Sequence, residues 1–516
     1  MSTDRTSAVW LCLALASVLA LAQPARAEAP LSAIDWLSQS VNTPAAPVRP
    51  AEEPAVTVGP TTEDIAVTVL DGPSLDATGL LPPAVTGLPR NLWGLGRTDE
   101  IVAHIRAERT GTLPALQSLM TTLLLAEADP PADSGGNGRL LLARVDKLLD
   151  LGALDQAAAL IDAAGELNPE LFRRRFDVAL LTGTEDLACE EMTGNPQLAP
   201  TFPARIFCLA RSGDWNAAAL TLRTAQALGY VTEEEDALLS RFLDPDLYEG
   251  EASLAAPNRP SPLNWRMFEA IGEPLPTATL PLAFAQADLR SNAGWKSQIE
   301  AAERLTRSGA VSPNRLLGLY TERKPAASGG VWDRARAIQT LEAALAAGDP
   351  GEVAELLPGV WDQMVIAELE VPFAILFAEP LRQMALPGYA GSLAFRIGLL
   401  SPDYRAVAAR HRPADRTEAY LAGLANGSVE GLTAPDSLGR AIAPAFTAPV
   451  PSEATQALLD DGRVGEAILT ALDEIDTGLK SDLVGVTQGL SLLRRIGMED
   501  AARRTALELM LLERRG

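Results

Sequence analysis

Histidine is nearly absent from this chain of 516 residues, which has only His104 and His411. Neither has a second histidine or a cysteine at ligand spacing, so we predict no metal site and expect both to be surface residues. The sequence also lacks a Gly-x-Ser-x-Gly nucleophile elbow, a glycine-rich phosphate loop and a dinucleotide fingerprint. Without these motifs there is no signature of hydrolase or nucleotide chemistry. We therefore predict no catalytic residues, no cofactor and no enzymatic activity.

Positive charge is scarce as well. The chain has 43 lysines and arginines against 67 aspartates and glutamates, which gives a formal net charge of −24. Such a surface repels phosphate backbones and anionic lipid headgroups. We expect no nucleic-acid partner and no peripheral membrane binding, whereas an apolar and basic ligand would suit the charge. Solubility alone is the simpler explanation of the acidity.

Cysteine is limited to three residues, and Cys12 lies in the apolar run near the start. The other two, Cys189 and Cys208, flank Pro196 and Pro200, which break helices. If the two cysteines lie on an antiparallel helical hairpin that turns between these prolines, their thiols face each other. A disulfide there would contribute roughly 3 kcal/mol by restricting the unfolded chain. Two buried free cysteines remain the alternative.

The first 27 residues have the pattern of a secretory signal peptide. Arg5 precedes an apolar run from Ala8 to Ala22, and Gln-Pro-Ala-Arg-Ala follows, with a small-x-small cleavage site ending at Ala27. The run is short for a membrane span, so we expect cleavage after Ala27 and a periplasmic protein without membrane insertion. An uncleaved anchor is the alternative.

The segment 28–60 combines a short apolar helix with a proline-rich tether. The apolar residues of the expected helix, our candidates for partner binding, are Leu31, Ile34, Trp36, Leu37 and Val41. Prolines at short intervals between 42 and 60 hold the backbone extended. Such a helix on a tether suggests a docking peptide, and packing back on its own solenoid is an equal alternative. From 61 to 97 we expect an extended segment, with Ile65–Leu70 as a short strand.

The stretch from 138 to 170 predicts two helices joined by a tight turn. In the second helix, Leu154, Ala157 and Ile161 recur at three- and four-residue spacing, which places them on one face. Gly152 marks the turn before this helix, and Asn168-Pro169 is expected to end it. The unit is therefore a helical hairpin that needs neighbours to bury its apolar face.

This hairpin resembles the tetratricopeptide repeat. The positions that match that family's turn glycine, packing residues and closing proline are Gly152, Ala157, Ile161, Ala164 and Pro169, although Leu141 stands where an aromatic residue is expected. The Gly-x-x-x-x-Ala pattern recurs at Gly183, Gly213, Gly462 and Gly497, with first intervals of 31 and 30 residues and a last one of 35. The resemblance implies an all-α fold, an α-solenoid of such repeats, behind a disordered or extended N-terminal segment.

Proline-rich breaks divide the rest of the chain. The expected segments are a signal peptide (1–27), the helix and tether (28–60), an extended part (61–97), a first block of helical repeats (98–245), a linker (246–262), a second helical block (263–432), an Ala/Pro linker (433–451) and C-terminal repeats (452–516). Within the second block, Pro372 and Pro380 are expected to interrupt an apolar run.

The resemblance implies a non-catalytic scaffold that binds an envelope protein or peptide in a groove lined by the first helix of each repeat. Arg173, Arg174 and Arg205 are candidate groove residues, with surface solvation as their simpler role. One alternative is a structural envelope protein without a groove. Another is a peptidoglycan-related enzyme or accessory factor, because helical superhelices precede the catalytic domain of some soluble lytic transglycosylases. Nothing after Ser452 resembles such a catalytic domain.

Overall fold

The computed structural model describes residues 74–165 and 167–512, and this part of the chain is all-α. Its only β-type pairing is an isolated bridge between Leu81 and Ala126. None of its helices is long and apolar enough to cross a membrane. The predicted fold class is therefore confirmed. The expected strand at 65–70 lies outside the described residues.

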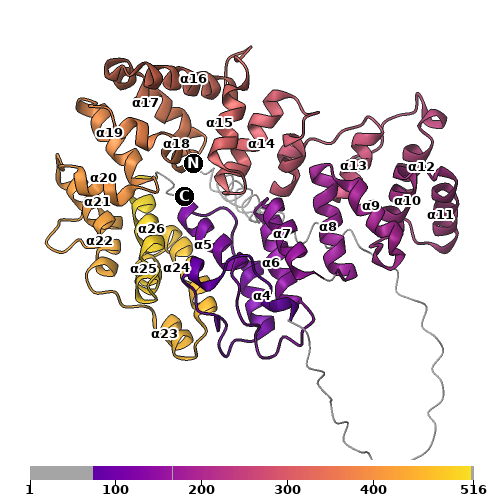
Figure 1. Ribbon diagram of the computed structural model, residues 1–516, viewed down its shortest axis with the longest axis horizontal. Helices are drawn as coiled ribbons and strands as arrows, with labels where there is room; N and C mark the ends of the chain where they lie inside the picture. Colours follow the sequence, from indigo (N-terminus) through magenta and orange to yellow (C-terminus); the bar gives the residue numbers. More distant parts are fainter. Residues whose placement is uncertain (1–73, 166, 513–516) are drawn as a thin grey trace, which may run out of the picture. The chain divides into compact units, whose positions relative to one another are not determined.

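The helices follow one another with short connections (Figure 1). The first part contains η1 (Leu75–Ala77), α3 (Pro83–Thr86), α4 (Thr98–Ala107), α5 (Pro114–Leu125), α6 (Arg139–Asp150), α7 (Leu154–Ala164), α8 (Pro169–Thr182), α9 (Glu185–Gly194), η2 (Pro196–Leu198), α10 (Phe202–Arg211), α11 (Trp215–Leu228), α12 (Glu233–Leu243), η3 (Pro245–Tyr248) and α13 (Pro262–Ala270). The middle part contains η4 (Thr277–Thr279), η5 (Leu282–Leu289), α14 (Trp295–Arg307), α15 (Pro313–Glu322), α16 (Val331–Ala347), α17 (Pro350–Ile366), α18 (Glu370–Arg382) and α19 (Gly388–Leu399). The last part contains α20 (Tyr404–Arg410), α21 (Arg416–Asn426), α22 (Ser437–Ile442), η6 (Ala443–Phe446), α23 (Glu453–Asp460), α24 (Val464–Lys480), α25 (Val484–Arg495) and α26 (Glu499–Leu511).

Successive helices pack on each other in sequence order, as in a solenoid. α6 packs on α7, α8 on α9, α10 on α11, α16 on α17 and α24 on α25. In the first of these hairpins, Gly152 makes the turn with φ +72°, and Ala157 and Ile161 are fully buried. A positive φ of this size suits glycine because it has no Cβ. The predicted hairpin is thus confirmed.

The end of α7 differs from the expectation. The helix ends at Ala164, its C-cap Gly165 has φ +77°, and Pro169 is the first residue of α8. Asn168 caps that next helix, since its side chain accepts a hydrogen bond from the Leu171 N–H at 2.9 Å. Proline suits a first helical position because its missing N–H has no partner there. The Asn-Pro pair therefore starts a helix, and the prediction that it ends one was wrong.

The segment 433–451, predicted to be a linker, contains α22 and η6. Their residues Leu438, Ile442 and Phe446 are buried in the main hydrophobic core. Small residues and prolines around these three weaken the local pattern, so burial against neighbouring helices decides the structure.

The last helices contact the first ones. α24 packs on α4 and α5, and α26 packs on α5, so the yellow C-terminal helices lie beside the indigo helices (Figure 1). We call this contact the seam. Gly94 and Gly462 touch through their backbones, and a Cβ on Gly465 would lie 2.5 Å from the buried ring of Trp93. The Gly465 N–H also donates to Leu92 O at 2.8 Å. Glycine at these positions therefore lets the two ends approach closely.

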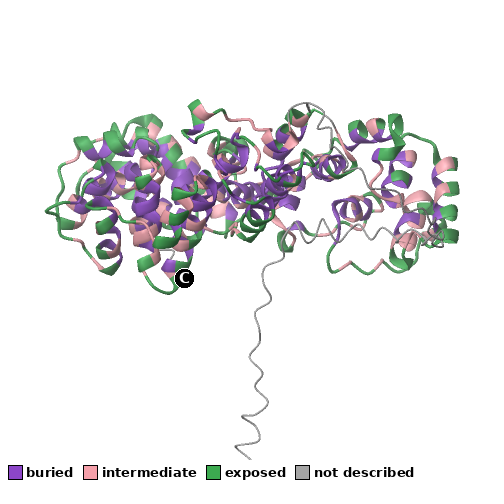
Figure 2. Ribbon diagram, turned by 90° about the horizontal axis from the view of Figure 1, so that it is seen from below, coloured by how far each residue is buried: buried purple, intermediate pink, exposed green. Residues whose placement is uncertain are grey.

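The described residues form two large cores. The main one extends from Leu88 to Leu512 and includes both sides of the seam. The second belongs to residues 172–268 and is rich in phenylalanine. Purple buried residues fill the interior in Figure 2, whereas the helices at the right-hand end, where α11 and α12 lie in Figure 1, present green and pink surfaces. We call residues 169–270, α8 to α13, the stapled unit, because a disulfide crosses it.

Candidate functional site

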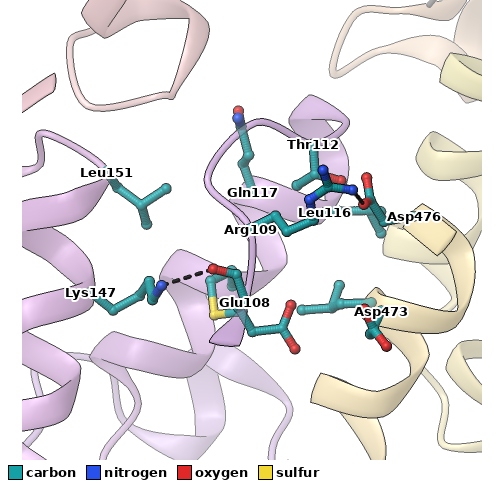
Figure 3. Close-up of a pocket in the computed structure, with 11 residues that line it drawn as sticks. Glu108, Arg109, Thr112, Leu116, Gln117, Lys147, Leu151, Asp473 and Asp476 are labelled. Atoms are coloured by element: carbon teal, nitrogen blue, oxygen red, sulfur yellow. Dashed lines mark hydrogen bonds and ion pairs between the residues drawn. The ribbon is translucent and has the colours of Figure 1, made fainter. Parts of the chain in front are cut away.

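A small pocket lies in the seam (Figure 3). Loop α4–α5, α5 and α6 supply one side of it, and α24 supplies Leu472, Asp473 and Asp476. Its cavity volume is about 10 Å³. A space of this size holds about one water molecule, so it is too small for an organic substrate. We interpret this pocket as part of the packing between the two ends of the described chain.

Five of the eleven residues that line the pocket are charged. Arg109 Nη1 and Lys480 Nζ both bind Asp476 Oδ2, at 2.7 and 2.8 Å. Lys147 is buried, and its Nζ donates to Glu108 O at 2.8 Å and lies 3.4 Å from Asp150 Oδ2. These contacts pair basic with acidic side chains along the seam. Ion pairs that are partly shielded from water favour one arrangement of the first and last helices.

Glu108 is the exception in this network. Figure 3 shows its carboxyl group pointing toward Asp473. The pKa of Glu108 is raised to about 8, chiefly by burial and further by the charges of Asp473 and Asp476, while Lys147 opposes the shift. Close carboxylates disfavour each other's charged form. The pocket is therefore a titratable contact between α24 and the first helices.

The described residues contain no group of three or more His, Cys, Asp and Glu side chains that could hold a metal ion. His104 is exposed on α4. His411 is not a plain surface residue, because it stacks on Phe395 with ring centroids 3.6 Å apart and contacts Glu418 at 2.7 Å. Burial of Glu418 opposes its charged form, but hydrogen bonds from the Ala414 N–H, His411 and Ser392 lower its pKa. His411 thus has a structural role in holding α20 to α21.

The predicted groove is partly occupied by the chain itself. The first helices of the hairpins are α6, α8, α10 and α12, but α13 packs on α8 and α12, and η5 packs on α6 and α8. Met267 and Phe284 are fully buried in these contacts, and Gln286 Nε2 donates to Gly152 O at 2.7 Å. A ligand would have to displace this packed core. These contacts cover parts of α6, α8 and α12, and the groove itself stays a prediction.

The three candidate groove arginines differ in how far they are buried. Arg174 is buried and binds both carboxylate oxygens of Asp146, at 2.6 and 3.0 Å, and Glu170. Arg173 is half-buried, and Arg205 is exposed. A buried, bidentate pair of this kind orders the contact between α6 and α8. Arg174 is thus a structural residue and not a groove residue.

Cys189 and Cys208 form the predicted disulfide, with Cα atoms 5.0 Å apart. They lie on α9 and α10, which pack on each other across the turn at η2. The bond links neighbouring hairpins in the stapled unit, whose core includes Phe172, Phe176 and Phe207. It therefore holds together the part of the chain that presents α11.

α11 is an edge helix, and it lies at the right-hand edge of Figure 1. It packs on α10 and α12 through a face that includes Ala218, Leu222 and Ala225, all buried. On the opposite face Leu220 is 67% exposed and Leu228 is 58% exposed. The helix has no carboxylate, and Arg223 is its only charged residue. Large apolar residues therefore occur on both faces of α11, although only one face is covered.

Carboxylates lie near both ends of α11. Asp214 caps its start by accepting a hydrogen bond from the Ala217 N–H. Near the other end, Gln226 Nε2 of α11 donates to Asp236 Oδ1 at 2.5 Å, which brings the first turn of α12 close. That turn carries Glu233, Glu234, Glu235 and Asp236. The surroundings of the helix ends are thus acidic, and we call the stripe formed by Leu220, Thr224, Ala227 and Leu228 the α11 stripe.

The predicted partner-binding residues fall elsewhere. Leu31, Ile34, Trp36, Leu37 and Val41 lie outside the described residues, so their role stays a prediction. The sequence does contain a signal for the α11 stripe, because apolar residues occur on both faces of 215–228 with a single charge between them. The repeat pattern includes only the turn glycine before this stretch, Gly213. Which face is covered depends on neighbouring helices and could not be predicted from one helix.

The comparisons add no relative to this description. No protein-family model, no curated protein and no solved structure matches the chain. The resemblance to tetratricopeptide repeats therefore depends on the chain's own hairpins and turn glycines. Function has to be argued from the surface just described.

Proposed function

We propose that this protein is an exported, non-catalytic scaffold of tetratricopeptide-like hairpins that binds a protein or peptide in the cell envelope. The observation that carries the proposal is the α11 stripe, an apolar surface on a helix that has neighbours on one face only. Apolar side chains on a helix normally face the core. Exposed apolar side chains that gather on one face mark a binding surface.

The proposed export depends on the pattern of residues 1–27, with its cleavage site at Ala27. An oxidising compartment would also allow the disulfide between Cys189 and Cys208 to persist. Mass spectrometry of the protein from the periplasmic fraction tests this part. A mature chain beginning at Glu28, with no thiol alkylated before reduction, is the expected result. A full-length chain in the membrane fraction would instead indicate the uncleaved anchor.

Binding is tested by a photo-crosslinking residue placed in living cells at 220, 224 or 228. Matched positions on exposed residues outside the stapled unit, Val85 and Val450, serve as controls. The proposal predicts specific protein adducts from at least one surface of the chain. Repeating the experiment without residues 28–60 shows whether the N-terminal segment contributes adducts of its own. Absence of adducts at every position would contradict the scaffold.

A purely structural protein is the second candidate. It is favoured by the cover that α13 and η5 place over parts of α6, α8 and α12, because this cover leaves less of these helices free for a ligand. In that case deletion of 28–60 should lower the melting temperature by several degrees, since the segment would pack along its own solenoid. If the segment is a docking arm, the deletion leaves the melting temperature unchanged.

A further inference from the structure

We infer that the α11 stripe binds an amphipathic helix of a partner protein, with leucine-like residues on one face and lysines or arginines on its flanks. The inference rests on the proposed scaffold function and names the surface and the class of partner. It depends on three features of the stapled unit: the spacing of the stripe, the lack of a covering element and the charge around it.

The spacing matches one face of a helix. Leu220, Thr224, Ala227 and Leu228 recur at intervals of four, three and one residues, and all four are exposed. Side chains at such intervals lie on one side of a helix. The small Ala227 and Thr224 between two leucines leave room for another helix to approach closely. Helices that bind in this way use anchors at i, i+4 and i+7.

Nothing in the described part of the chain covers the stripe. Leu220 and Leu228 are 67% and 58% exposed, whereas Ala218 and Ala225, on the other face, are fully buried. The same end of the unit also exposes Leu247. Apolar surface of this kind costs free energy in water. A partner helix that covers two leucines would recover part of this cost.

The surrounding charge selects the partner. Residues 183–256 contain 13 aspartates and glutamates but only four arginines. Glu233 and Glu234 are exposed in the first turn of α12, which the bond between Gln226 and Asp236 holds beside α11. An apolar helix flanked by cations complements this arrangement, and an acidic one is repelled. The chain's own segment 31–41 has no lysine or arginine and so fits the acidic surroundings less well.

A labelled synthetic helix tests the inference on the whole mature chain, residues 28–516, by fluorescence anisotropy. The probe has leucines at i, i+4, i+7 and i+8 and lysines on its flanks. One control peptide replaces every lysine with glutamate, and a second keeps the composition but scatters the leucines. We expect binding of the first peptide at least about tenfold tighter than binding of either control.

Two variants locate the binding. Leu220→Gln with Leu228→Gln removes the apolar anchors without adding charge, and we expect the dissociation constant to rise at least about tenfold. The matched control, Val85→Gln with Val450→Gln, changes two equally exposed residues elsewhere and should leave it unchanged. Unchanged melting temperatures would show that both variants are folded. Equal binding by the two variants would overturn the inference.

Two further variants test the charge. Glu233→Gln with Glu234→Gln should weaken binding and reduce its dependence on salt, because exposed ion pairs are screened. Arg223→Gln should strengthen binding, since this arginine repels the cations of the peptide. If neither change has an effect, apolar contact alone selects the partner, and the inference that the partner helix has basic flanks is wrong.

Other occupants give different results. A dimer of the mature chain that dissociates in the Leu220→Gln, Leu228→Gln variant would make the occupant a second copy of this chain. Tighter peptide binding after deletion of 28–60 would make it the chain's own N-terminal segment. Either result overturns the inference. In the cell, crosslinked adducts that form only at positions other than 220, 224 and 228 would support the scaffold function but refute binding at the α11 stripe. No adducts at any position would refute both proposals.

Discussion

The seam and the stapled unit are held together in opposite ways. In the seam, Arg109 binds Asp476 and the Ala115 N–H donates to Glu508 Oε2 at 2.8 Å, across 367 and 393 residues of sequence. In the stapled unit, helices adjacent in sequence pack together and the disulfide spans only 19 residues. Contacts that close long stretches of chain form only when both ends are in place. The seam therefore depends on the whole fold, whereas the stapled unit is held mostly by contacts between helices close in sequence and joins the main core through α8 and α13.

The two regions also differ in what they leave uncovered. The seam buries Trp93, Lys147 and Asp476 around a pocket for about one water molecule. The stapled unit has its own phenylalanine-rich core but exposes leucines on α11. Buried contacts of the first kind serve stability, and an uncovered apolar stripe is available for binding. Changes in either region should therefore have separate effects.

The largest effect is expected from Trp93→Ala in the seam. Trp93 is buried against Gly465, so its removal leaves a cavity and should cost about 3–5 kcal/mol. Hydrogen exchange should show loss of protection in α23–α25, while residues 185–243 keep theirs. Trp215→Ala in α11 is the matched control, and it should cost less because the Trp215 side chain is half exposed. Equal loss of protection in both regions would show that they unfold as one unit.

Removal of the disulfide should have the next largest effect. Cys189→Ala with Cys208→Ala releases a short loop, for which the chain-entropy model gives roughly 3 kcal/mol. The expected loss of protection is in α9 and α10, with the seam unchanged. Reduction of the unchanged protein should reproduce the effect in the stapled unit. If protection is lost first at α24, the two regions are coupled.

Local features were predictable from the sequence, and long-range ones were not. The hairpin at Gly152 and the disulfide follow from turn residues and spacing within about one repeat. The seam joins Leu92 to Gly465, and no signal near either residue indicates the other. The same holds for η5, which covers parts of α6 and α8. Tertiary contacts of this kind depend on the whole arrangement of helices.

The prediction that two prolines interrupt the second helical block was wrong. Pro372 and Pro380 were expected to interrupt an apolar run, but α18 continues from Glu370 to Arg382 through both. Pro372 lies in the first turn, where a missing N–H breaks no helical hydrogen bond. Burial of Phe373 and Phe377 in the main core offsets the cost of Pro380 in the last turn. Packing thus outweighs local preference in this helix.

A smaller and pH-dependent effect is expected at Glu108 in the seam. Its pKa is about 8 in the folded protein against an ordinary value of 4.5. The folded state then binds the proton more tightly, so this group's contribution to stability is lost as pH rises from about 4.5 to about 8. Glu108→Gln mimics the protonated form. We expect it to match the unchanged protein near pH 4 and to be more stable by about 1–2 kcal/mol at pH 8, after allowance for solvent screening.

Urea unfolding at several pH values measures this difference. Glu355→Gln, at an exposed position on α17, is the matched control and should be neutral at every pH. Glu108→Gln should act on the seam and leave the stapled unit unchanged in hydrogen exchange. A variant that is less stable than the unchanged protein at pH 8 would contradict the assignment of Glu108 as a destabilising buried carboxylate.

The smallest effect on stability is expected from Leu220→Gln with Leu228→Gln. Both side chains are more than half exposed, and glutamine favours helix nearly as well as leucine, so the change should stay within about 0.5 kcal/mol. The matched change on the buried face, Leu222→Gln, removes a leucine that is 5% exposed and should cost several times more. Urea unfolding of the two variants compares the faces directly. A large cost for the exposed pair would mean that the leucines already have a partner within the chain, and the contrast between a closed seam and an open edge helix would fail.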